Sequence, residues 1–578
     1  MESIPLGKQR YSLSAIAIIA LACLLMVSQW RIKGESGHAW ERTIRGDAIG
    51  YYSYLPALFI HGDLQHDAGA TAYINETPQG RVRKYPVGVA VMEVPFFLCA
   101  DMMVRAQGGL RTGYEKPYHI AIALSGVFSL LIGLVVLRRV LLTWGATDKT
   151  IAWVLVLLAG GTSMMYGAAM SSAYSHHWSF MAVACFLRAV QRAFSDRRDK
   201  SLVAAVFWLG IIALLRPVNV MVVLAAPLVI APGASLPGLL RTFRMRTWLM
   251  ACAVVALVAG LQPLMWWMQC GHWFAWSYGD EGFHWSRPEV LEVLFGPMRG
   301  FFFWWPVMLA LIPGTVLLWR RSHRGGLLFT GYFVLLIYIT SAWWSWYYGD
   351  GFGMRPLIDH FPVFALPITA FLGAVGSAWR RVMMGASAIL IALHTVQTWQ
   401  YEKGIIHPHS MSWRKYKAVF LRTGDPWRGA LGGNFEMAQY APHGYDDVFA
   451  GELGASTLDA QNPYGQGLAI DSAQLPDRRL FVEAWITRTE PSPGSSREAV
   501  VVCEIGNDGA QSFYYSFKLN DLPTPPAAAT ETWHCAFPMG APGPRDSLKL
   551  YVWLPGEGSV RIDGFKAEVK AVRAGPER

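Results

Sequence analysis

Charged residues are scarce in this chain of 578 residues: 16% are Asp, Glu, Lys or Arg, whereas 53% are hydrophobic. In soluble proteins about a quarter of the residues are charged, so this balance excludes an ordinary soluble enzyme. The net charge of +10 does not by itself indicate nucleic acid, because the cytoplasmic loops of membrane proteins are rich in Lys and Arg. We therefore predict a membrane protein with no nucleic-acid partner.

Short catalytic motifs are missing as well. The sequence has no HExxH, P-loop, GxSxG or CxxC motif, and no GxGxxG after a predicted strand. His176 and His177 are adjacent, which is not the spacing of a metal site. We predict no metal ligands from these residues and leave the need for a divalent ion open.

Long apolar segments, in contrast, recur from Leu13 to Trp399, which predicts a bundle of membrane-spanning helices. The first, at residues 13–30, follows Lys8 and Arg10 and leads into SQWRIKGES, which contains no small-residue cleavage site. We therefore expect a retained anchor and not a cleaved signal peptide.

Six basic clusters separate the apolar segments, and the positive-inside rule places all of them in the cytoplasm. An even number of spans must then lie between successive clusters. Residues 86–104 break this parity and contain two acids and two prolines, so we expect them to lie along the membrane surface. The parity gives about eleven spans, a cytoplasmic N-terminus and outer loops at 31–116 and 269–300. The expected spans are 13–30, 118–137, 150–170, 178–194, 201–215, 217–231, 247–268, 301–319, 327–345, 357–377 and 382–399.

The first outer loop begins with an acid that precedes an aromatic run. After Asp47, apolar and aromatic residues recur at helical spacing, namely Tyr51, Tyr54, Leu55, Leu58 and Phe59. This pattern predicts an interfacial helix whose aromatic face rests on lipid headgroups, although Pro56 weakens it. A solvated acid at the end of a span is the plain alternative for Asp47.

Cations gather at other outer positions. Arg81, Arg83 and Lys84 come before the second surface segment, where they would attract an anionic lipid headgroup, above all a phosphate. Arg355 follows the glycine- and aromatic-rich stretch WWSWYYGDGFGM, which indicates an ordered loop. Arg216, at a tight turn between two spans, either reaches an anionic substrate or caps the turn. Weaker candidates for substrate contacts are Tyr51, Tyr85, His176, Asp350 and His284.

Several of these features together resemble the C-type integral-membrane glycosyltransferases (GT-C), nearest to the protein O-mannosyltransferases and the aminoarabinose transferases of lipid A. They are the acid of the first outer loop, the aromatic helix that ends in His61-Gly62-Asp63-Leu64, the Lys84-Tyr85-Pro86 triplet and the stretch RPLIDHFPVFALP. The resemblance covers about residues 10–399 and implies two surface helices in the first outer loop.

The resemblance also implies an activity, namely transfer of a sugar from a polyprenyl-phosphate donor to a glycan, lipid or protein acceptor on the outer face. Asp47 would be the catalytic base, and Lys84 and Arg355 would bind the donor phosphate. The acid pair often found in this family is Asp47-Ala48 here, so neither the donor sugar nor a metal role is carried over. With no second carboxylate in view as a nucleophile, direct displacement predicts inversion at the anomeric carbon.

The composition changes after Trp399. Residues 400–440 read as a linker, and alternating runs at 480–488, 499–507, 512–520, 532–539, 548–555 and 560–569 predict a jelly-roll-like β-sandwich at 441–578. Its ending, LKLYVWLPGEGSVRIDGFKAEV, resembles the last strands of carbohydrate-binding modules. Glycan contact would need exposed rows of Trp or Tyr, and a structural or assembly role is the alternative. Cys503 and Cys535 are candidates for a disulfide if this domain lies in an oxidising compartment.

The sequence thus predicts a polytopic helical membrane protein of the bacterial inner membrane, with residues 1–399 as a GT-C-like domain and the C-terminal domain on the outer side. A glycosyltransferase is the leading hypothesis. A transporter or flippase would also suit many helices around a basic pocket, but it would favour internal repeats and charges in mid-span. A membrane-anchored protein that binds or assembles glycans is the third hypothesis.

Overall fold

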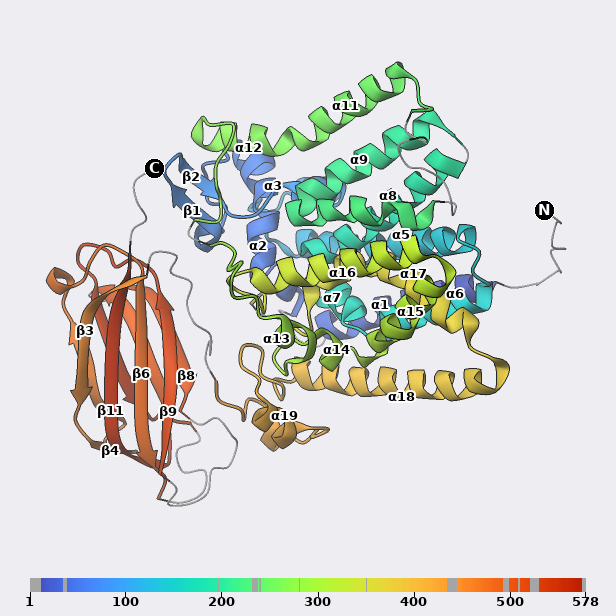
Figure 1. Ribbon diagram of the computed structural model, residues 1–578. Helices are drawn as coiled ribbons and strands as arrows, with labels where there is room; N and C mark the ends of the chain where they lie inside the picture. Colours follow the sequence, from blue (N-terminus) through green and yellow to red (C-terminus); the bar gives the residue numbers. More distant parts are fainter. Residues whose placement is uncertain are drawn as a thin grey trace.

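The structure is a computed structural model, and it describes residues 12–34, 39–195, 197–230, 238, 241–279, 281–349, 351–433, 444–491, 498–507, 510–519 and 530–573. Helices from α1 (Leu13–Gly34) to α19 (Trp413–Val419) come first in the chain, and antiparallel strands from β3 (Tyr445–Leu453) to β11 (Ser559–Val572) follow. Figure 1 shows these strands on the left, beside the helical part.

Six helices among the described residues are long and apolar enough to cross a membrane, judged by length and composition. A seventh is added if α6 (Asp148–Gly160) and α7 (Met164–Met170), which are bent by 54°, count as one broken span. The chain is therefore an integral membrane protein with six or seven candidate spans. The six are Leu13–Trp30 of α1, α5 (Lys116–Thr143), α11 with α12 (Met245–Cys270), α16 (His323–Ala342), η6 with α17 (Arg355–Ala374) and α18 (Ser377–Glu402).

The expectation of eleven spans exceeds this number, because four expected spans are short, broken or polar. The helix α9 (Asp199–Leu215) has 17 residues and η4 (Pro217–Val229) has 13, whereas crossing the hydrocarbon core takes about 20. Residues 301–321 are divided into α14 (Phe301–Trp304), η5 (Pro306–Ala310) and α15 (Leu311–Arg321). The helix α8 (Ser175–Ser195) carries two histidines, two arginines and a glutamine.

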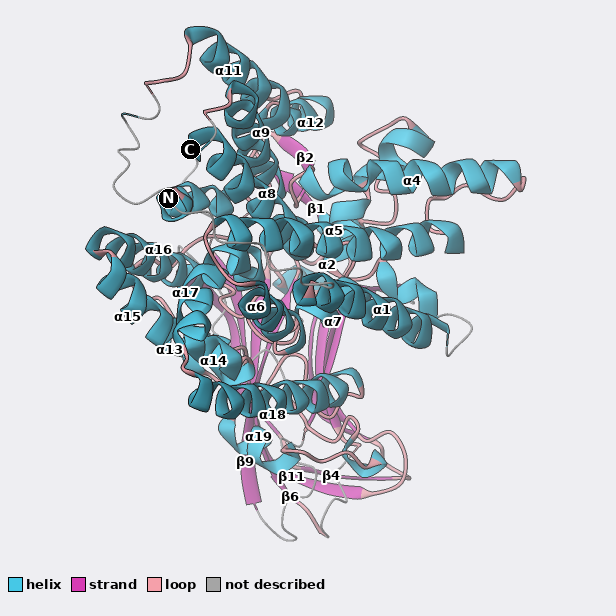
Figure 2. Ribbon diagram, turned by 90° about the vertical axis from the view of Figure 1, so that its right-hand side faces the viewer, coloured by secondary structure: helices cyan, strands magenta, loops and turns pink. Residues whose placement is uncertain are grey.

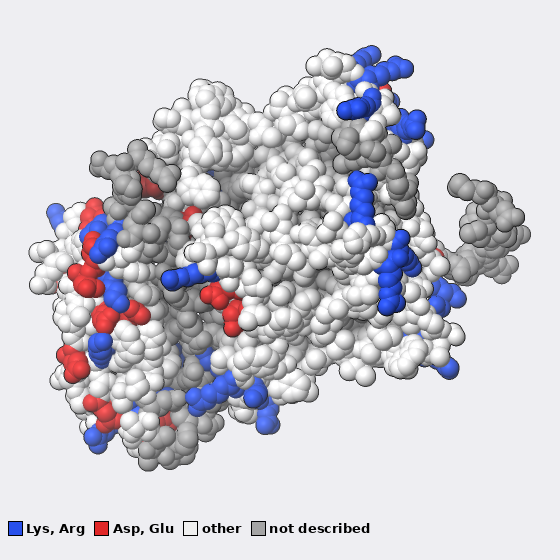
Figure 3. All heavy atoms as spheres, in the orientation of Figure 1, with Lys and Arg blue, Asp and Glu red and all other residues white. Residues whose placement is uncertain are grey.

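The helices pack around α5 and α8. Gly133 of α5 allows this close approach, because a Cβ atom there would lie 2.5 Å from the ring of Phe180 on α8. In Figure 2, α6 points toward the viewer, whereas α4 (Gly88–Ala106) is seen from the side, so the axis of α4 runs across that of α6. Figure 3 shows a group of Lys and Arg side chains at the end of the helical part that lies away from the strands.

The loop between α1 and α5 contains the predicted aromatic run as three short helices: α2 (Asp47–Tyr52), α3 (Tyr54–Pro56) and the π-helical turn η2 (Ala57–His61). Tyr51, Tyr54 and Leu55 of this run are buried within the protein, whereas Leu58 is 37% exposed and Phe59 is half-buried. Residues of α4 and α5 share an apolar cluster with this run and cover it. The prediction of headgroup contact is therefore wrong for Tyr51, Tyr54 and Leu55.

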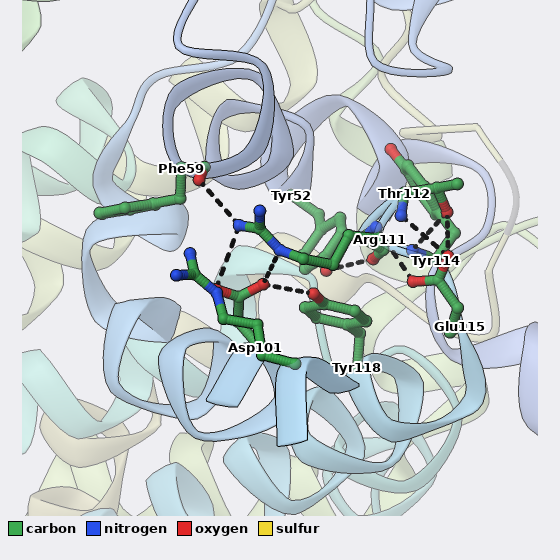
Figure 4. Close-up of polar contacts among 10 residues, drawn as sticks. Tyr52, Phe59, Asp101, Arg111, Thr112, Tyr114, Glu115 and Tyr118 are labelled. Carbon is green, nitrogen blue, oxygen red and sulfur yellow. Dashed lines mark hydrogen bonds and ion pairs between the residues drawn. The ribbon is translucent and has the colours of Figure 1, made fainter. Parts of the chain in front are cut away.

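The acids of α4 also point into the protein. Asp101 accepts hydrogen bonds from Arg105, Arg111 and Tyr118, and Arg111 also donates to the carbonyl of Phe59 in η2. Figure 4 shows these side chains converging between α4, α5 and the loop that joins them. The cluster ties the aromatic run to α4.

The C-terminal strands form two antiparallel sheets, with the orders β5-β10-β7-β8 and β3-β11-β6-β9, and β4 pairs with β11. Buried residues of both sheets share one core, so the sheets pack face to face as a sandwich. Cys503 and Cys535 are buried in this core as free thiols. The six predicted runs correspond to β6 (Leu480–Thr489), β7 (Val500–Asn507), β8 (Ala510–Lys518), β9 (Thr530–Met539), β10 (Ser547–Trp553) and β11, whereas β3, β4 (Ser456–Asp459) and β5 (Tyr464–Ile470) were not predicted.

Candidate active site

Asp47 is the first residue of α2 and is partly exposed. The preceding Gly46 has a φ of 59°, which is a conformation that residues with a side chain rarely adopt. The hydroxyl of Tyr85 donates a hydrogen bond of 2.8 Å to Asp47 Oδ1, and Arg355 Nη2 lies 3.9 Å from Asp47 Oδ2. The structure therefore brings together Asp47, Tyr85 and Arg355, three residues that the sequence had separated by up to 308 positions.

Arg355 begins the 3-10 helix η6 (Arg355–His360), and its guanidinium is largely buried. It donates to the carbonyl of Tyr348 and lies over the ring of Tyr174, 5.1 Å from the ring centre. Gly351 leaves room for it, because a Cβ atom at that position would lie 2.5 Å from Arg355 Nε. The predicted contact residue Asp350 lies outside the described residues.

Arg216 and His176 belong to a different cluster, which forms around Asp359. The carboxylate of Asp359 is fully buried, accepts a hydrogen bond of 2.6 Å from Asn219, and lies 2.9 Å from His176 Nδ1 and 3.8 Å from Arg216 Nε. Arg216 also lies over the ring of Tyr348, whose carbonyl accepts from Arg355. The two predicted residues therefore face an internal acid, which the sequence reasoning did not single out.

Lys84 follows the hairpin of β1 (Ile74–Thr77) and β2 (Gly80–Arg83) and forms an ion pair with Glu281, with Nζ and Oε1 2.5 Å apart. Its ammonium also lies 5.7 Å from the ring centre of Tyr85. Ser277, in the same segment as Glu281, donates a hydrogen bond to the carbonyl of Lys84. The 269–300 loop thus covers Lys84, in line with the expectation that it covers a site.

A cavity of about 420 Å³ lies next to Asp47. Arg355, His176 and Arg45 line it, whereas neither Asp47 nor Lys84 is among its lining residues. The remaining polar lining includes Arg42, Tyr166, Tyr174, His177 and Glu402, and Glu402 pairs with Arg42 at 2.7 Å and accepts from Tyr166.

The charge of this cavity follows from its lining. It contains three guanidinium groups and one carboxylate, so it favours an anionic or highly polar molecule. The sequence reasoning missed Arg45, although it directly precedes Gly46-Asp47, and it missed Arg42 and Glu402.

The last two predicted contact residues are Tyr51 and His284. The ring of Tyr51 stacks on that of Tyr85, with the ring centres 4.3 Å apart. The backbone N–H of His284 donates to the carbonyl of Ala342, and His284 does not line the cavity. Among the described residues, no group of three or more His, Cys, Asp or Glu side chains has the arrangement of a metal site.

The fold and this site define an integral membrane protein that holds a helix-borne carboxylate beside an arginine-lined cavity. No family model matches the sequence, and no curated protein matches it. One similar solved structure is ArnT from Cupriavidus metallidurans bound to undecaprenyl phosphate, at 12% identity and a TM-score of 0.42, with 72% of this chain and 69% of that chain covered. The apo state of ArnT is similar at 13% identity and a TM-score of 0.43, with 71% of this chain and 69% of that chain covered. The arabinosyltransferase EmbB from Mycobacterium smegmatis is also similar, at 11% identity and a TM-score of 0.37, with 99% of this chain and 66% of that chain covered.

These likenesses concern the fold alone. At 11–13% identity and with TM-scores below 0.5, the likeness assigns no activity, ligand or residue role to this chain.

Proposed function

We propose that the protein is a membrane glycosyltransferase that moves a sugar from a polyprenyl-phosphate donor to an acceptor hydroxyl on the outer face of the membrane. The observation that carries this proposal is the position of the Asp47 carboxylate, which lies between the Tyr85 hydroxyl and the Arg355 guanidinium, beside a cavity rich in arginine. A base next to fixed cations is the arrangement that displacement of a phosphate leaving group requires.

In the proposed reaction the acceptor oxygen attacks the anomeric carbon, and the bond from that carbon to the phosphate oxygen breaks. The acceptor proton passes to Asp47, and polyprenyl phosphate leaves with the electron pair of the broken bond. Attack opposite to the leaving group inverts the anomeric configuration. Arg355 and Lys84 stabilise the charge that develops on the phosphate, because both are cations fixed near Asp47.

The two cations, Arg355 and Lys84, differ in how available they are to a phosphate. Arg355 already faces the cavity, whereas Lys84 is paired with Glu281. Donor binding at Lys84 therefore has to separate that pair. Arg216, also proposed as a phosphate ligand, is neutralised by the buried Asp359, so its contribution is weaker than that of Arg355.

The orientation and organisation follow from the same proposal. We place the basic end of the helical part in the cytoplasm of a bacterial inner membrane, and the sandwich outside, because Lys and Arg gather at the end away from the strands (Figure 3). Residues 1–399 would then form the GT-C-like domain, 400–440 the linker and 441–578 the jelly-roll-like domain, with the helices of the first outer loop at the membrane surface. ArnT was solved with undecaprenyl phosphate, and we propose a sugar linked to a lipid phosphate of this class as the donor.

The test is transfer by the purified full-length protein. Labelled polyprenyl-phosphate sugar and a membrane extract are supplied, and the wild type is compared with Asp47→Asn. We expect labelled acceptor with the wild type and a loss of at least about a hundredfold in the variant, on the scale of a lost general base. Equal transfer by both proteins would exclude Asp47 as the base, and movement of the donor across the membrane without transfer would support a transporter or flippase.

A second candidate function, glycan binding, rests on the outer surface of the sheet β5-β10-β7-β8. Tyr464 of β5 is 63% exposed, and its ring lies parallel to that of Trp553 on β10, with 9° between the rings and 6.2 Å between their centres. Tyr551 lies beside them, and Tyr514 of β8 is 42% exposed. Tyr551 and Trp553 are half-buried, so two exposed and two half-buried rings share this surface. Aromatic rings of this kind are suited to stacking on the C–H faces of sugars, which supports a glycan-binding role.

A further inference from the structure

Asp47 and Gly50 lie one helical turn apart on α2, so they share one face of that helix. The ring of Tyr85 lies against this face at Gly50. A Cβ atom at position 50 would lie 2.6 Å from Tyr85 Cδ2 and 2.9 Å from Tyr73 Cγ, which is closer than carbon atoms approach without a shift. Only glycine therefore leaves the space that the Tyr85 ring occupies.

The other contacts of Tyr85 fix its ring and its backbone. The ring stacks on Tyr51 with 16° between the two planes, and the edge of Tyr278 packs against it. The hydroxyl of Tyr54 donates a hydrogen bond of 2.8 Å to the Tyr85 carbonyl. With its ring and backbone both held, the Tyr85 hydroxyl points at one atom, Asp47 Oδ1.

The two oxygens of Asp47 consequently have different surroundings. Oδ1 accepts from Tyr85, while Oδ2 lies 3.9 Å from Arg355, which lines the cavity. We infer that Tyr85 is a positioning residue that occupies Oδ1 and leaves Oδ2 to take the acceptor proton, an inference that rests on the proposed glycosyltransferase function. Tyr85 therefore acts through the carboxylate, in place of the substrate contact expected from the sequence.

Tyr85 is suited to this role because it keeps its proton. Burial, with a contribution from the charge of Asp47, raises the pKa of Tyr85 well above its ordinary value. The hydroxyl remains a donor over the whole working pH range. A hydrogen bond donated to a carboxylate favours the charged form, so its loss raises the pKa of that carboxylate.

Four titratable or charged side chains from different segments face Asp47. They are Tyr51 on α2 itself, Tyr85 before α4, Tyr278 in the 269–300 loop and Arg355 at the start of η6. Tyr85 is the one that donates a hydrogen bond to Asp47 in the described structure, so a phenylalanine in its place isolates this effect from stacking and packing.

The experiment measures transfer against pH for the full-length protein and the Tyr85→Phe variant, with labelled polyprenyl-phosphate sugar and membrane extract. We expect the acidic limb of kcat/KM to move up by about one pH unit, on the scale of a hydrogen bond to a charged group. We expect kcat to fall about tenfold while the KM for the donor is unchanged. Gly50→Ala keeps the Tyr85 hydroxyl but places a Cβ atom where the Tyr85 ring lies. It should therefore also move the acidic limb up, and the double variant should differ little from Tyr85→Phe alone.

Tyr114→Phe is the matched control, since it removes a tyrosine hydroxyl of the same loop that donates to the Ala68 carbonyl. Its acidic limb should match the wild type. An unshifted limb in Tyr85→Phe, with the thermal unfolding of the variant unchanged, would overturn the positioning role. Full transfer by Asp47→Asn would instead reject the proposed function, so the two failures are distinguishable.

Discussion

Lys84 and Glu281 are 197 positions apart in the sequence, yet their side chains form an ion pair in which Nζ and Oε1 are 2.5 Å apart. Both side chains are mostly buried, with 21% and 12% of their surface exposed. Glu281 therefore holds the cation that the proposed donor phosphate needs.

Glu281→Gln should tighten the binding of polyprenyl phosphate. A phosphate that binds Lys84 has to displace the carboxylate, and the uncharged amide competes less well for the ammonium. We expect the Kd to fall about three- to tenfold, equivalent to about 1 kcal/mol. The measurement is equilibrium binding of polyprenyl phosphate to the detergent-solubilised protein.

Lys84→Ala is the companion variant, and it should weaken the same binding. If it has no effect, Lys84 is not a phosphate ligand. If Lys84→Ala weakens binding but Glu281→Gln leaves it unchanged, the ion pair does not compete with the donor.

Asp359→Asn should destabilise the helical part. The variant leaves Arg216 without its buried counter-charge and weakens the contact with His176. Breaking a buried pair in this way costs about 3–5 kcal/mol, which would be measured as a lower midpoint of thermal unfolding. Arg216→Gln in the same background should recover part of the loss, because no unpaired charge then remains. A loss below about 1 kcal/mol would show that the pair does not stabilise the fold.

Asp101→Asn should lower stability in a way that depends on pH. Burial tends to raise the pKa of Asp101, but hydrogen bonds from Arg111 and Tyr118 and the charges of Arg111 and Arg105 lower it overall. A carboxyl whose pKa is lower in the folded state stabilises the protein above its unfolded pKa of about 3.9, and that stability is lost as the pH falls through the folded value.

The free energy of unfolding, measured by thermal unfolding, should therefore be about 1–2 kcal/mol lower for Asp101→Asn than for the wild type at neutral pH. This difference should shrink below about pH 4. Glu76→Gln serves as the control, since Glu76 is exposed and its nearest contact with Arg81 is 3.8 Å. A difference that is the same at all pH values would contradict the ionic role of Asp101.

Tyr464→Ala should weaken binding of the full-length protein to cell-envelope polysaccharide if the aromatic surface of β5 and β10 holds glycans. We expect a loss of about 1–2 kcal/mol, or roughly five- to thirtyfold in Kd, because one stacking ring is removed. The comparison is Trp485→Ala, which removes an aromatic ring from the outer face of the other sheet, where Trp485 stacks on His534. Equal losses in both variants would indicate a nonspecific effect on the sandwich.

Local pattern predicted much of the fold. The spans expected near 118–137, 247–268, 327–345, 357–377 and 382–399 correspond to helices that qualify by length and composition, because long apolar runs need no distant partner to be recognised. Six strands were found from their alternation. Six or seven spans qualify by length and composition where eleven were expected, in part because chain breaks such as the one at Trp305 interrupt an apolar stretch.

The site was predicted in part, and the missing residues share a reason. The proximity of Asp47 and Arg355 follows the expectation that both lie on one face of the protein. Asp359 and Glu281 were missed because their partners, Arg216 and Lys84, are more than 140 positions away, and periodicity says nothing about such contacts. The pairing of Arg216 and His176 with Asp359 was not predicted for the same reason.

The burial of Tyr51, Tyr54 and Leu55 has a consequence for the surroundings of the protein. Because Tyr54 and Leu55 pack with residues of α4 and α5, and Tyr51 stacks on Tyr85, the depth of Asp47 is set by contacts within the chain and not by the level of the lipid headgroups. Membranes differ in thickness by several ångströms, and helices adapt to such differences by tilting. Since Tyr85 and Arg355 both contact the Asp47 carboxylate, we expect a tilt of the protein to carry the three side chains together.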